Sequence, residues 1–160
     1  MAYARILVAV DDSPAGLEAA QTAVELAAEW HATVRAITVV HDHAVTRAIG
    51  DRDETAKRIV EGGRSLLGWV ARLAAGRGVP CETFVRDGEP FRRVLEEADA
   101  WDAQLVVMGR SDRRGPSSPY LGSETAHVLE FVERPVLVVP RRPPTSSGNA
   151  SARAPGAGRH

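Results

Sequence analysis

Three short runs of this sequence are apolar at every position, and this feature most narrows the possible folds. The runs are Ile6 to Val10, Leu105 to Met108 and Val136 to Val139. A strand with one face in water alternates polar and apolar side chains, so a run without alternation predicts a parallel strand covered by helices on both faces. We therefore expect an α/β fold built on a parallel sheet.

Two further segments have strand character. Thr33 to Val40 is rich in β-branched residues, whereas Cys81 to Val85 alternates polar and apolar side chains. Alternation is typical of a strand with one face near solvent. The second segment is therefore our prediction for an edge of the sheet.

Four intervening stretches have helical periodicity. The first begins after Ser13-Pro14 and runs to about Trp30, because Ser13 can accept N–H groups of the first turn and Pro14 suits the first helical position. Two shorter helices are predicted around residues 91–98 and 125–132. The longest helix has one apolar face, formed by Ala56, Ile59, Val60, Gly63, Leu66, Leu67, Val70, Leu73 and Ala74.

Five strands alternating with four helices predict one sheet with right-handed helical crossovers. The chain has 160 residues, about one domain. We assign the domain to residues 1–140 and predict a disordered tail over 141–160, which is rich in Pro, Ser and Gly and offers no apolar side chain large enough to build a core.

The charge balance argues against a nucleic-acid or anionic-membrane partner, since 20 basic and 21 acidic residues give a net charge of -1. No apolar run approaches the ~20 residues that a membrane helix needs, so a soluble protein is expected. The N-terminus leads directly into a strand without a leader-like segment, which predicts a cytoplasmic location.

Several catalytic and metal-binding patterns have little support. Cys81 is the single cysteine, which excludes an internal disulfide and favours a packed thiol. His41-x-His43 lacks further metal ligands at a suitable spacing, so we interpret both as loop histidines. Glu89, Glu96 and Glu97 are attributed to a solvated helix face. Neither a G-x-S-x-G elbow nor a P-loop motif occurs.

Two segments that follow strands could carry a binding site. Val10-Asp11-Asp12-Ser13-Pro14 places a carboxylate at the tip of the first strand, directly before a helix. The fourth strand ends at Met108-Gly109, and Gly122-Ser123 opens the next helix. Ligands of open α/β sheets bind beyond the carboxyl ends of the strands, where the strand order reverses. These segments would adjoin if the first and fourth strands were neighbours.

Over about residues 4–140 the chain resembles the universal stress protein family. The resemblance rests on Ile6-Leu-Val-Ala-Val-Asp-x-Ser-Pro14, the Val-Val-Met-Gly ending at Gly109, the later Gly122-Ser123, and Arg134-Pro-Val-Leu-Val-Val-Pro140. It implies a single-domain, Rossmann-like open sheet of five parallel strands in the order 3-2-1-4-5, with helices on both faces, as in the adenine nucleotide α-hydrolase fold.

Nucleotide-binding members of that family carry Gly-x2-Gly-x9-Gly-Ser/Thr after the fourth strand. Gly109, Gly122 and Ser123 match this motif with the spacing preserved, while Asp112 replaces the middle glycine. Glycines let backbone N–H groups approach phosphate oxygens, and a helix N-terminus adds positive potential. The carboxylates of Asp112 and Glu124 would face the phosphates, so affinity is expected to be lower or to depend on Mg²⁺.

The resemblance implies roles for further residues. Arg110, Arg113 and Arg114 are candidate phosphate partners, although they also suit a solvated basic loop. Asp11 is a candidate acceptor for adenine or ribose, and equally a carboxylate favoured at a helix start. The rest of the predicted cofactor-binding set, whose apolar members would equally suit a core, is Ala9, Val39, Met108 and Thr125.

Three functions remain open at this stage. The first is a stress or regulatory protein that binds ATP or AMP. The second is a dimeric interaction module without nucleotide, favoured by Asp112 and Glu124. The third is an ATP-using enzyme of the related pyrophosphatase type, whose Ser-Gly-Gly-x-Asp-Ser after the first strand is replaced here by Asp11-Asp12-Ser13-Pro14. No catalytic residue is predicted. A homodimer is expected through the last strand, formed by Val136, Leu137, Val138 and Val139.

Overall fold

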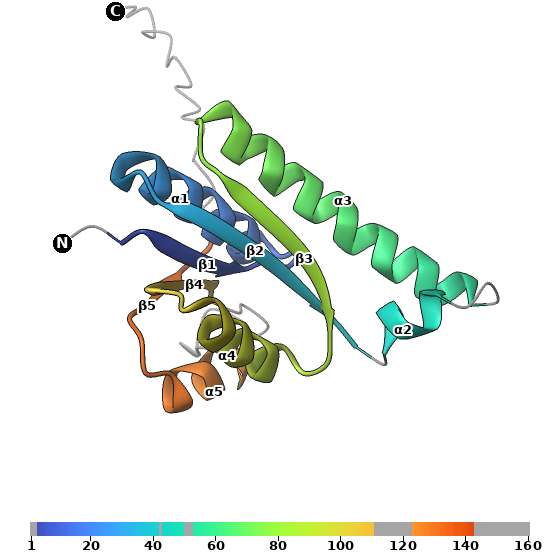
Figure 1. Ribbon diagram of the computed structural model, residues 1–160. Coiled ribbons are helices and arrows are strands. Elements are labelled where there is room, and N and C mark those ends of the chain that lie inside the picture. Colours follow the sequence, from blue (N-terminus) through green and yellow to red (C-terminus); the bar gives the residue numbers. More distant parts are fainter. Residues whose placement is uncertain (1–2, 42, 50–52, 111–122, 143–160) are drawn as a thin grey trace, which may run out of the picture.

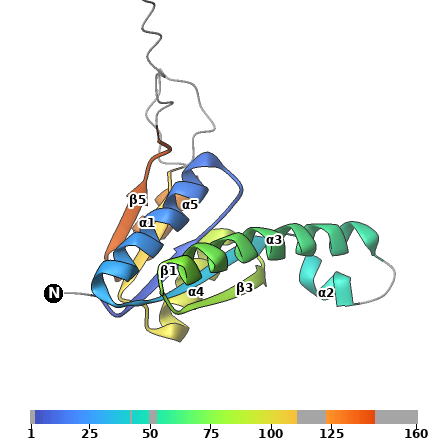
Figure 2. The same cartoon turned by 90° about the horizontal axis from the view of Figure 1, so that it is seen from above.

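The computed structural model describes residues 3–41, 43–49, 53–110 and 123–142, which form one five-stranded sheet with helices on both faces (Figures 1 and 2). The strand order is β3-β2-β1-β4-β5 and all pairs are parallel, as the resemblance implied. The elements are β1 (Arg5–Ala9), α1 (Pro14–Trp30), β2 (Thr33–Val40), α2 (Ala44–Ile49), α3 (Glu54–Gly76), β3 (Cys81–Asp87), α4 (Pro90–Trp101), β4 (Leu105–Gly109), α5 (Ser123–Phe131) and β5 (Val136–Val139).

β1 is the central strand, and its burial explains the unbroken apolar run. Ile6 pairs with Val34 of β2 on one side and with Leu105 of β4 on the other. Ile6, Leu7 and Val8 are fully buried. The prediction of a strand covered on both faces is confirmed, and β3 lies at an edge as its alternating sequence predicted.

α1 and α3 cover one face of the sheet, and α4 and α5 cover the other (Figure 1). The Ser13 side chain caps α1, accepting a hydrogen bond from the Gly16 N–H at 3.0 Å. α3 contributes a buried face that includes Leu67 and Val70. Small residues let α1 lie close to the strands: Ala15, Ala19, Ala20, Ala23 and Ala27 are all buried.

The structure corrects two helix predictions. Ile59 was expected on the buried face of α3 but is 41% exposed, whereas Ala56 and Val60 of the same half of the helix are buried with Ala44 of α2 and Val40 of β2. The short helix α2 was not predicted at all. Asp87, far away in the sequence, caps α2 by accepting hydrogen bonds from the N–H groups of Val45 at 2.9 Å and Thr46 at 3.2 Å.

The α4–α5 face has a smaller apolar core and a buried charged cluster beside it. Glu97, predicted on a solvated helix face, is 5% exposed, so that prediction is wrong. Its carboxylate accepts hydrogen bonds from Arg35 at 3.0 Å and from Arg86 at 3.2 Å. We call this the Glu97 cluster; its members are Arg35, Glu82, Phe84, Arg86, Glu97 and Trp101.

Aromatic rings complete the Glu97 cluster. The Arg35 guanidinium lies 4.7 Å from the ring centre of Trp101 and 5.0 Å from that of Phe84. Burial on its own would raise the pKa of Glu97, but the hydrogen bonds and positive charges of Arg86 and Arg35 outweigh it and hold that pKa below its usual value. The carboxylate is therefore ionised and structural.

A second charged group joins the N-terminal ends of β1, β4 and β5. The Arg134 guanidinium donates to Asp99 at 2.8 Å and to the Ala103 carbonyl at 2.6 Å. Arg5 donates to Asp102 at 3.0 Å. The hydrogen bond to Asp99 is the main reason that the pKa of Arg134 is raised. We call these five residues the base cluster.

One prediction concerns the C-terminal tail. Arg141 and Arg142 are described, whereas the remainder of the predicted disordered tail, residues 143–160, lies outside the described residues.

Among the described residues, none of the helices combines the length and apolar character needed to cross a membrane. Cys81 packs against the core of the α1–α3 face, and burial raises the pKa of its thiol.

Candidate functional site

A pocket of about 540 Å³ lies at the carboxyl ends of β1 and β4, where the strand order reverses. The chain leaves β1 for α1 on one face of the sheet and leaves β4 toward α5 on the other, which opens a space between the two strand ends. We call it the strand-end pocket. Its lining residues are Ala9, Val10, Asp11, Asp12, Ser13, Gly16, Ile37, Val39, His41, Pro90, Val94, Met108, Gly109, Ser123, Glu124 and Thr125.

Most of the site residues expected from the sequence line this one pocket. They are Ala9, Asp11, Val39, Met108, Gly109, Ser123, Glu124 and Thr125. Arg110 directly follows β4 but is not among the lining residues. Asp112, Arg113, Arg114 and Gly122 lie outside the described residues. The roles of all these residues in binding stay predictions.

The inner part of the pocket is apolar. Ala9, Ile37 and Met108 come from three adjacent strands, and Val94 of α4 closes the same side. Ile37 is fully buried and Met108 is 6% exposed, so this surface is held by the core. A rigid apolar floor suits a flat, weakly hydrated ring.

Asp11 stands at the tip of β1 and organises the entry to α1. Its Oδ1 accepts hydrogen bonds from the backbone N–H of Ser13 at 3.0 Å and from the Ser13 hydroxyl. Within the described part of the chain, its Oδ2 makes no hydrogen bond. Both expected roles are therefore compatible, because one oxygen supports the helix start while the other is available to a ligand.

Close backbone approach, rather than a ligand, requires two glycines at the pocket. A Cβ placed on Gly109 would lie 2.6 Å from the carbonyl carbon and oxygen of Ala15, so only glycine lets β4 end against the start of α1. A Cβ on Gly16 would lie 2.7 Å from the Asp11 carbonyl oxygen. The sequence pattern indicated Gly109 but not Gly16, whose signal is a glycine in the first turn of a helix.

Glu124 has a partner that the sequence did not reveal. Its Oε2 accepts a hydrogen bond from the Phe91 N–H at 2.9 Å, while the cap residue Glu89 makes no side-chain cap hydrogen bond to α4. Glu124 of α5 therefore caps the N-terminus of α4, where the helix dipole favours negative charge. The Phe91 and His127 rings, whose centres are 4.7 Å apart, strengthen the same contact.

Among the described residues, the hydroxyl groups of the polar rim form hydrogen bonds within the fold. The Ser13 hydroxyl donates to Asp11 and accepts from the Gly16 N–H, so it serves the helix start. The Thr125 hydroxyl donates to the Gly109 carbonyl at 3.4 Å. His41 lines the pocket, but the described residues contain no group of three or more His, Cys, Asp or Glu side chains placed to hold a metal ion.

A doubly wound parallel sheet with a pocket at its strand-order reversal defines a class of α/β proteins that bind small ligands. Within this class, the sequence model of the universal stress protein family matches residues 2–140. The chain belongs to this family. Universal stress protein MJ0531 of Methanocaldococcus jannaschii is 33% identical over 139 residues, which cover 86% of this chain and 82% of the relative.

Two solved structures share the fold. One is a universal stress protein in complex with cAMP, with a TM-score of 0.64 and 24% identity over 87% of this chain and 98% of that chain. The other is the universal stress protein of Archaeoglobus fulgidus in complex with dAMP, with a TM-score of 0.65 and 22% identity over 87% of this chain and 99% of that chain. At these identities the likeness shows the fold alone.

Proposed function

We propose that this protein binds an adenine nucleotide, ATP or AMP, in the strand-end pocket and acts as a regulatory or stress-response protein in the cytoplasm. The observation that carries the proposal is the meeting of Asp11, Met108 and Ser123 around one pocket of about 540 Å³. Pockets for small ligands and cofactors have volumes of roughly 300–1,000 Å³. The nucleotide complexes of two fold relatives support the same choice of ligand.

In this proposal the pocket has a base end and a phosphate end. The apolar floor beside Val39 and Met108 suits the adenine ring, and the available oxygen of Asp11 can accept a ribose or adenine hydrogen bond. Ser123 opens α5, whose first N–H groups and positive dipole end suit a phosphate. Mg²⁺ would offset the carboxylates of Asp11 and Asp12 on the rim.

Binding rather than catalysis is the proposed activity. The hydroxyls of Ser13 and Thr125 are both occupied by hydrogen bonds within the fold. The Glu97 carboxylate is occupied by two guanidinium groups and does not line the pocket. The Ser13 hydroxyl does lie beside the Asp11 carboxylate, but the same hydroxyl accepts the Gly16 N–H and both groups hold the start of α1, so we assign them to the fold and not to nucleophilic catalysis.

Acid extraction of the purified protein, followed by nucleotide chromatography, tests for a bound nucleotide. Added ATP should then raise the thermal midpoint, since a ligand of the native state at a hundredfold excess over its dissociation constant stabilises that state by about 2.7 kcal/mol. An unchanged midpoint with millimolar ATP, ADP and AMP, with and without Mg²⁺, would refute the proposal.

A charge variant locates the phosphate end. Ser123→Asp keeps a favourable residue at the start of α5 but adds a negative charge, so it should reduce the ATP-induced shift while leaving stability without ATP nearly unchanged. Ser65→Asp, an exposed change on α3, is the matched control and should leave the shift intact. An equal loss in both variants would contradict the assignment.

A dimeric interaction module is the second candidate, and exposed apolar residues at α5 and β5 favour it. Leu129, Phe131 and Leu137 are 39%, 60% and 37% exposed. β5 (Val136, Leu137, Val138 and Val139) is an edge strand whose unpaired backbone groups can accept the same strand of a second copy. Light scattering at micromolar concentration tests this, and a monomer mass would exclude the dimer.

A further inference from the structure

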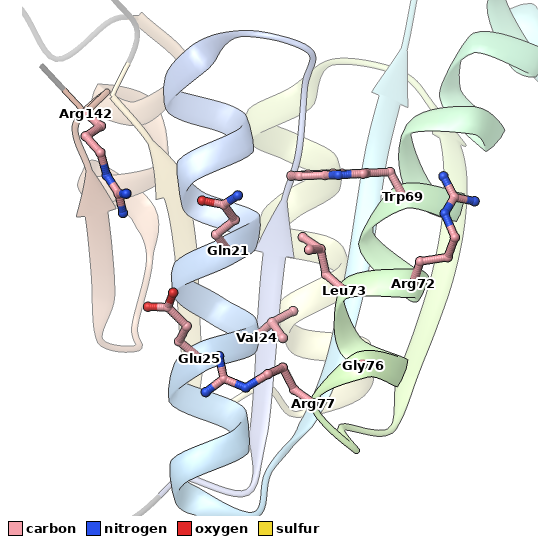
Figure 3. A pocket seen from close by; sticks show the side chains of 9 residues that line it. All are labelled: Gln21, Val24, Glu25, Trp69, Arg72, Leu73, Gly76, Arg77 and Arg142. Atoms are coloured by element: carbon pink, nitrogen blue, oxygen red, sulfur yellow. The ribbon is translucent and has the colours of Figure 1, made fainter. Parts of the chain in front are cut away.

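A second hollow, of about 490 Å³, lies between α1 and α3 (Figure 3). Val24 of α1 and Leu73 of α3 form its apolar part; Val24 is 2% exposed and fixed in the core. Gln21 and Glu25 form the wall on α1. We call it the α1–α3 groove. It shares no lining residue with the strand-end pocket.

The α3 wall combines a ring, an apolar side chain and a cation. Trp69 and Leu73 are spaced four residues apart, which places them on one side of α3, and Arg77 is the residue that follows the helix. Trp69 and Arg77 extend from α3 toward α1 on either side of Leu73 (Figure 3). The space beside Gly76 is open, because a Cβ built there would have no heavy atom within 4 Å.

The charges of the groove are unbalanced. Arg72 and Arg77 make no ion pair within the described part of the chain. Arg142, the remaining lining guanidinium, pairs with Glu18 at 3.4 Å. Glu25 is the one carboxylate among the described lining residues. Arg77 thus extends toward α1 without a fixed counter-charge, beside an apolar surface and an indole ring, whereas the Arg72 side chain lies on the side of α3 that faces away from α1 (Figure 3).

We propose that the α1–α3 groove binds a small planar aromatic carboxylate. The ring would lie on Val24 and Leu73 against Trp69, and the carboxylate would pair with Arg77, whose planar guanidinium matches a carboxylate in two parallel hydrogen bonds. Arg72 adds positive potential, and Glu25 disfavours a second anionic group on the α1 side. This proposal is independent of the nucleotide proposal, because the two sites have no residue in common.

The test uses 2-naphthoate as the probe and the neutral 2-naphthylmethanol as its control. Binding is followed by calorimetry and by ¹H–¹⁵N spectra of the full chain, in which the tryptophan side chains report separately. Trp69 lines the groove, whereas Trp30 makes an edge-to-face contact with Tyr3 and Trp101 belongs to the Glu97 cluster. The naphthoate should shift the Trp69 indole N–H signal and bind at least about tenfold more tightly than the alcohol, as expected for hydrogen bonds to a charged group.

Matched variants separate this site from general basicity. Arg77→Gln should weaken 2-naphthoate by about tenfold, whereas Arg64→Gln, which removes an exposed guanidinium of the same helix outside the groove, should leave affinity unchanged. Thermal melts verify that each variant is folded, and Arg72→Gln, with a smaller expected loss, replaces Arg77→Gln if that variant unfolds. Saturating ATP should not displace the probe.

Several results would overturn the proposal. These are no detectable binding at millimolar probe, equal affinity for the alcohol, equal losses in Arg77→Gln and Arg64→Gln, or displacement by ATP with signals at the strand-end pocket. Failure of ATP to bind would leave the expected naphthoate result intact, so the two proposals fail separately.

Discussion

The two faces of the sheet are held together by different physical means. The α1–α3 face is an aliphatic core in which alanines of α1 pack on β1 and the long helix α3 adds Leu67 and Val70. The α4–α5 face has a smaller apolar core, and the Glu97 cluster and the Glu124 cap complete it. Apolar burial is not sensitive to pH, whereas hydrogen bonds to carboxylates are. The strand-end pocket takes one wall from each face and so depends on both.

The largest effect is expected on the aliphatic face. Leu67→Ala should lower the free energy of unfolding by about 3 kcal/mol, because it removes a buried side chain and leaves a cavity. Urea denaturation measures the loss, which should be the same at pH 7 and pH 4. A loss that changes with pH would show that this face also depends on charge.

Gly109→Ala tests the close backbone contact between the end of β4 and the start of α1. The added Cβ would lie 2.6 Å from the Ala15 backbone, which no rotamer can relieve, so we expect a loss of about 2 kcal/mol. Gly62→Ala is the control, since its Cβ would meet nothing within 4 Å and helix propensity should raise stability by about 0.5–1 kcal/mol. Equal effects of the two substitutions would contradict the packing role of Gly109.

The Glu97 cluster should give a loss similar in size to that of Gly109→Ala, but dependent on pH. Glu97→Gln keeps the shape of the side chain and removes the charge that pairs with Arg35 and Arg86, so the loss at pH 7 should be about 2 kcal/mol. The folded pKa of Glu97 is lowered, so its stabilisation is present above the unfolded pKa of about 4.3 and disappears as pH falls through the folded pKa.

Denaturation curves of the parent and Glu97→Gln should therefore differ above about pH 5 and converge in stronger acid. Glu96→Gln is the matched control, because Glu96 is exposed and pairs only with the neighbouring Arg93 among the described residues. A constant difference between the parent and Glu97→Gln at every pH would show that Glu97 contributes by packing alone.

The smallest effect belongs to the cap between α5 and α4. Glu124→Gln weakens the hydrogen bond to the Phe91 N–H and removes the charge at the N-terminus of α4, for a loss of about 0.5–1 kcal/mol. Thermal melts should separate it from Glu130→Gln, an exposed change on the same helix with no expected effect. A stabilised Glu124→Gln variant would indicate repulsion between carboxylates at the pocket rim.

The sequence predicts the aliphatic face well because periodicity reports which side of an element is buried. It does not report partners from other elements. Asp87 caps α2, Arg86 and Arg35 neutralise Glu97, and Glu124 caps α4. Each of these contacts joins residues distant in sequence, so the sequence led to the interpretation of Glu97 as solvated and gave no cap for α2 or α4.

The strand-end pocket and the α1–α3 groove also differ in how far the sequence predicts them. The strand-end pocket lies at strand ends and helix starts, and Gly109 and Asp11 there belong to a recognisable motif. The strand order that unites these segments came from the family resemblance, not from periodicity. The α1–α3 groove is formed by side chains such as Trp69 and Arg77, whose spacing is common to any surface helix. Only the packing of two helices shows that they border a hollow.

The base cluster predicts which end of the sheet opens first in local unfolding. Arg134 and Arg5 fasten the N-terminal ends of β1, β4 and β5, at the end of the sheet opposite the strand-end pocket. Local opening should therefore start at the carboxyl ends of the strands, beside the strand-end pocket. Amide hydrogens near Gly109 should then exchange with solvent before those near Leu105. A ligand that bridges the carboxyl ends of β1 and β4 would hold these ends together. The difference in amide exchange rate between the two ends of β4 should then become smaller.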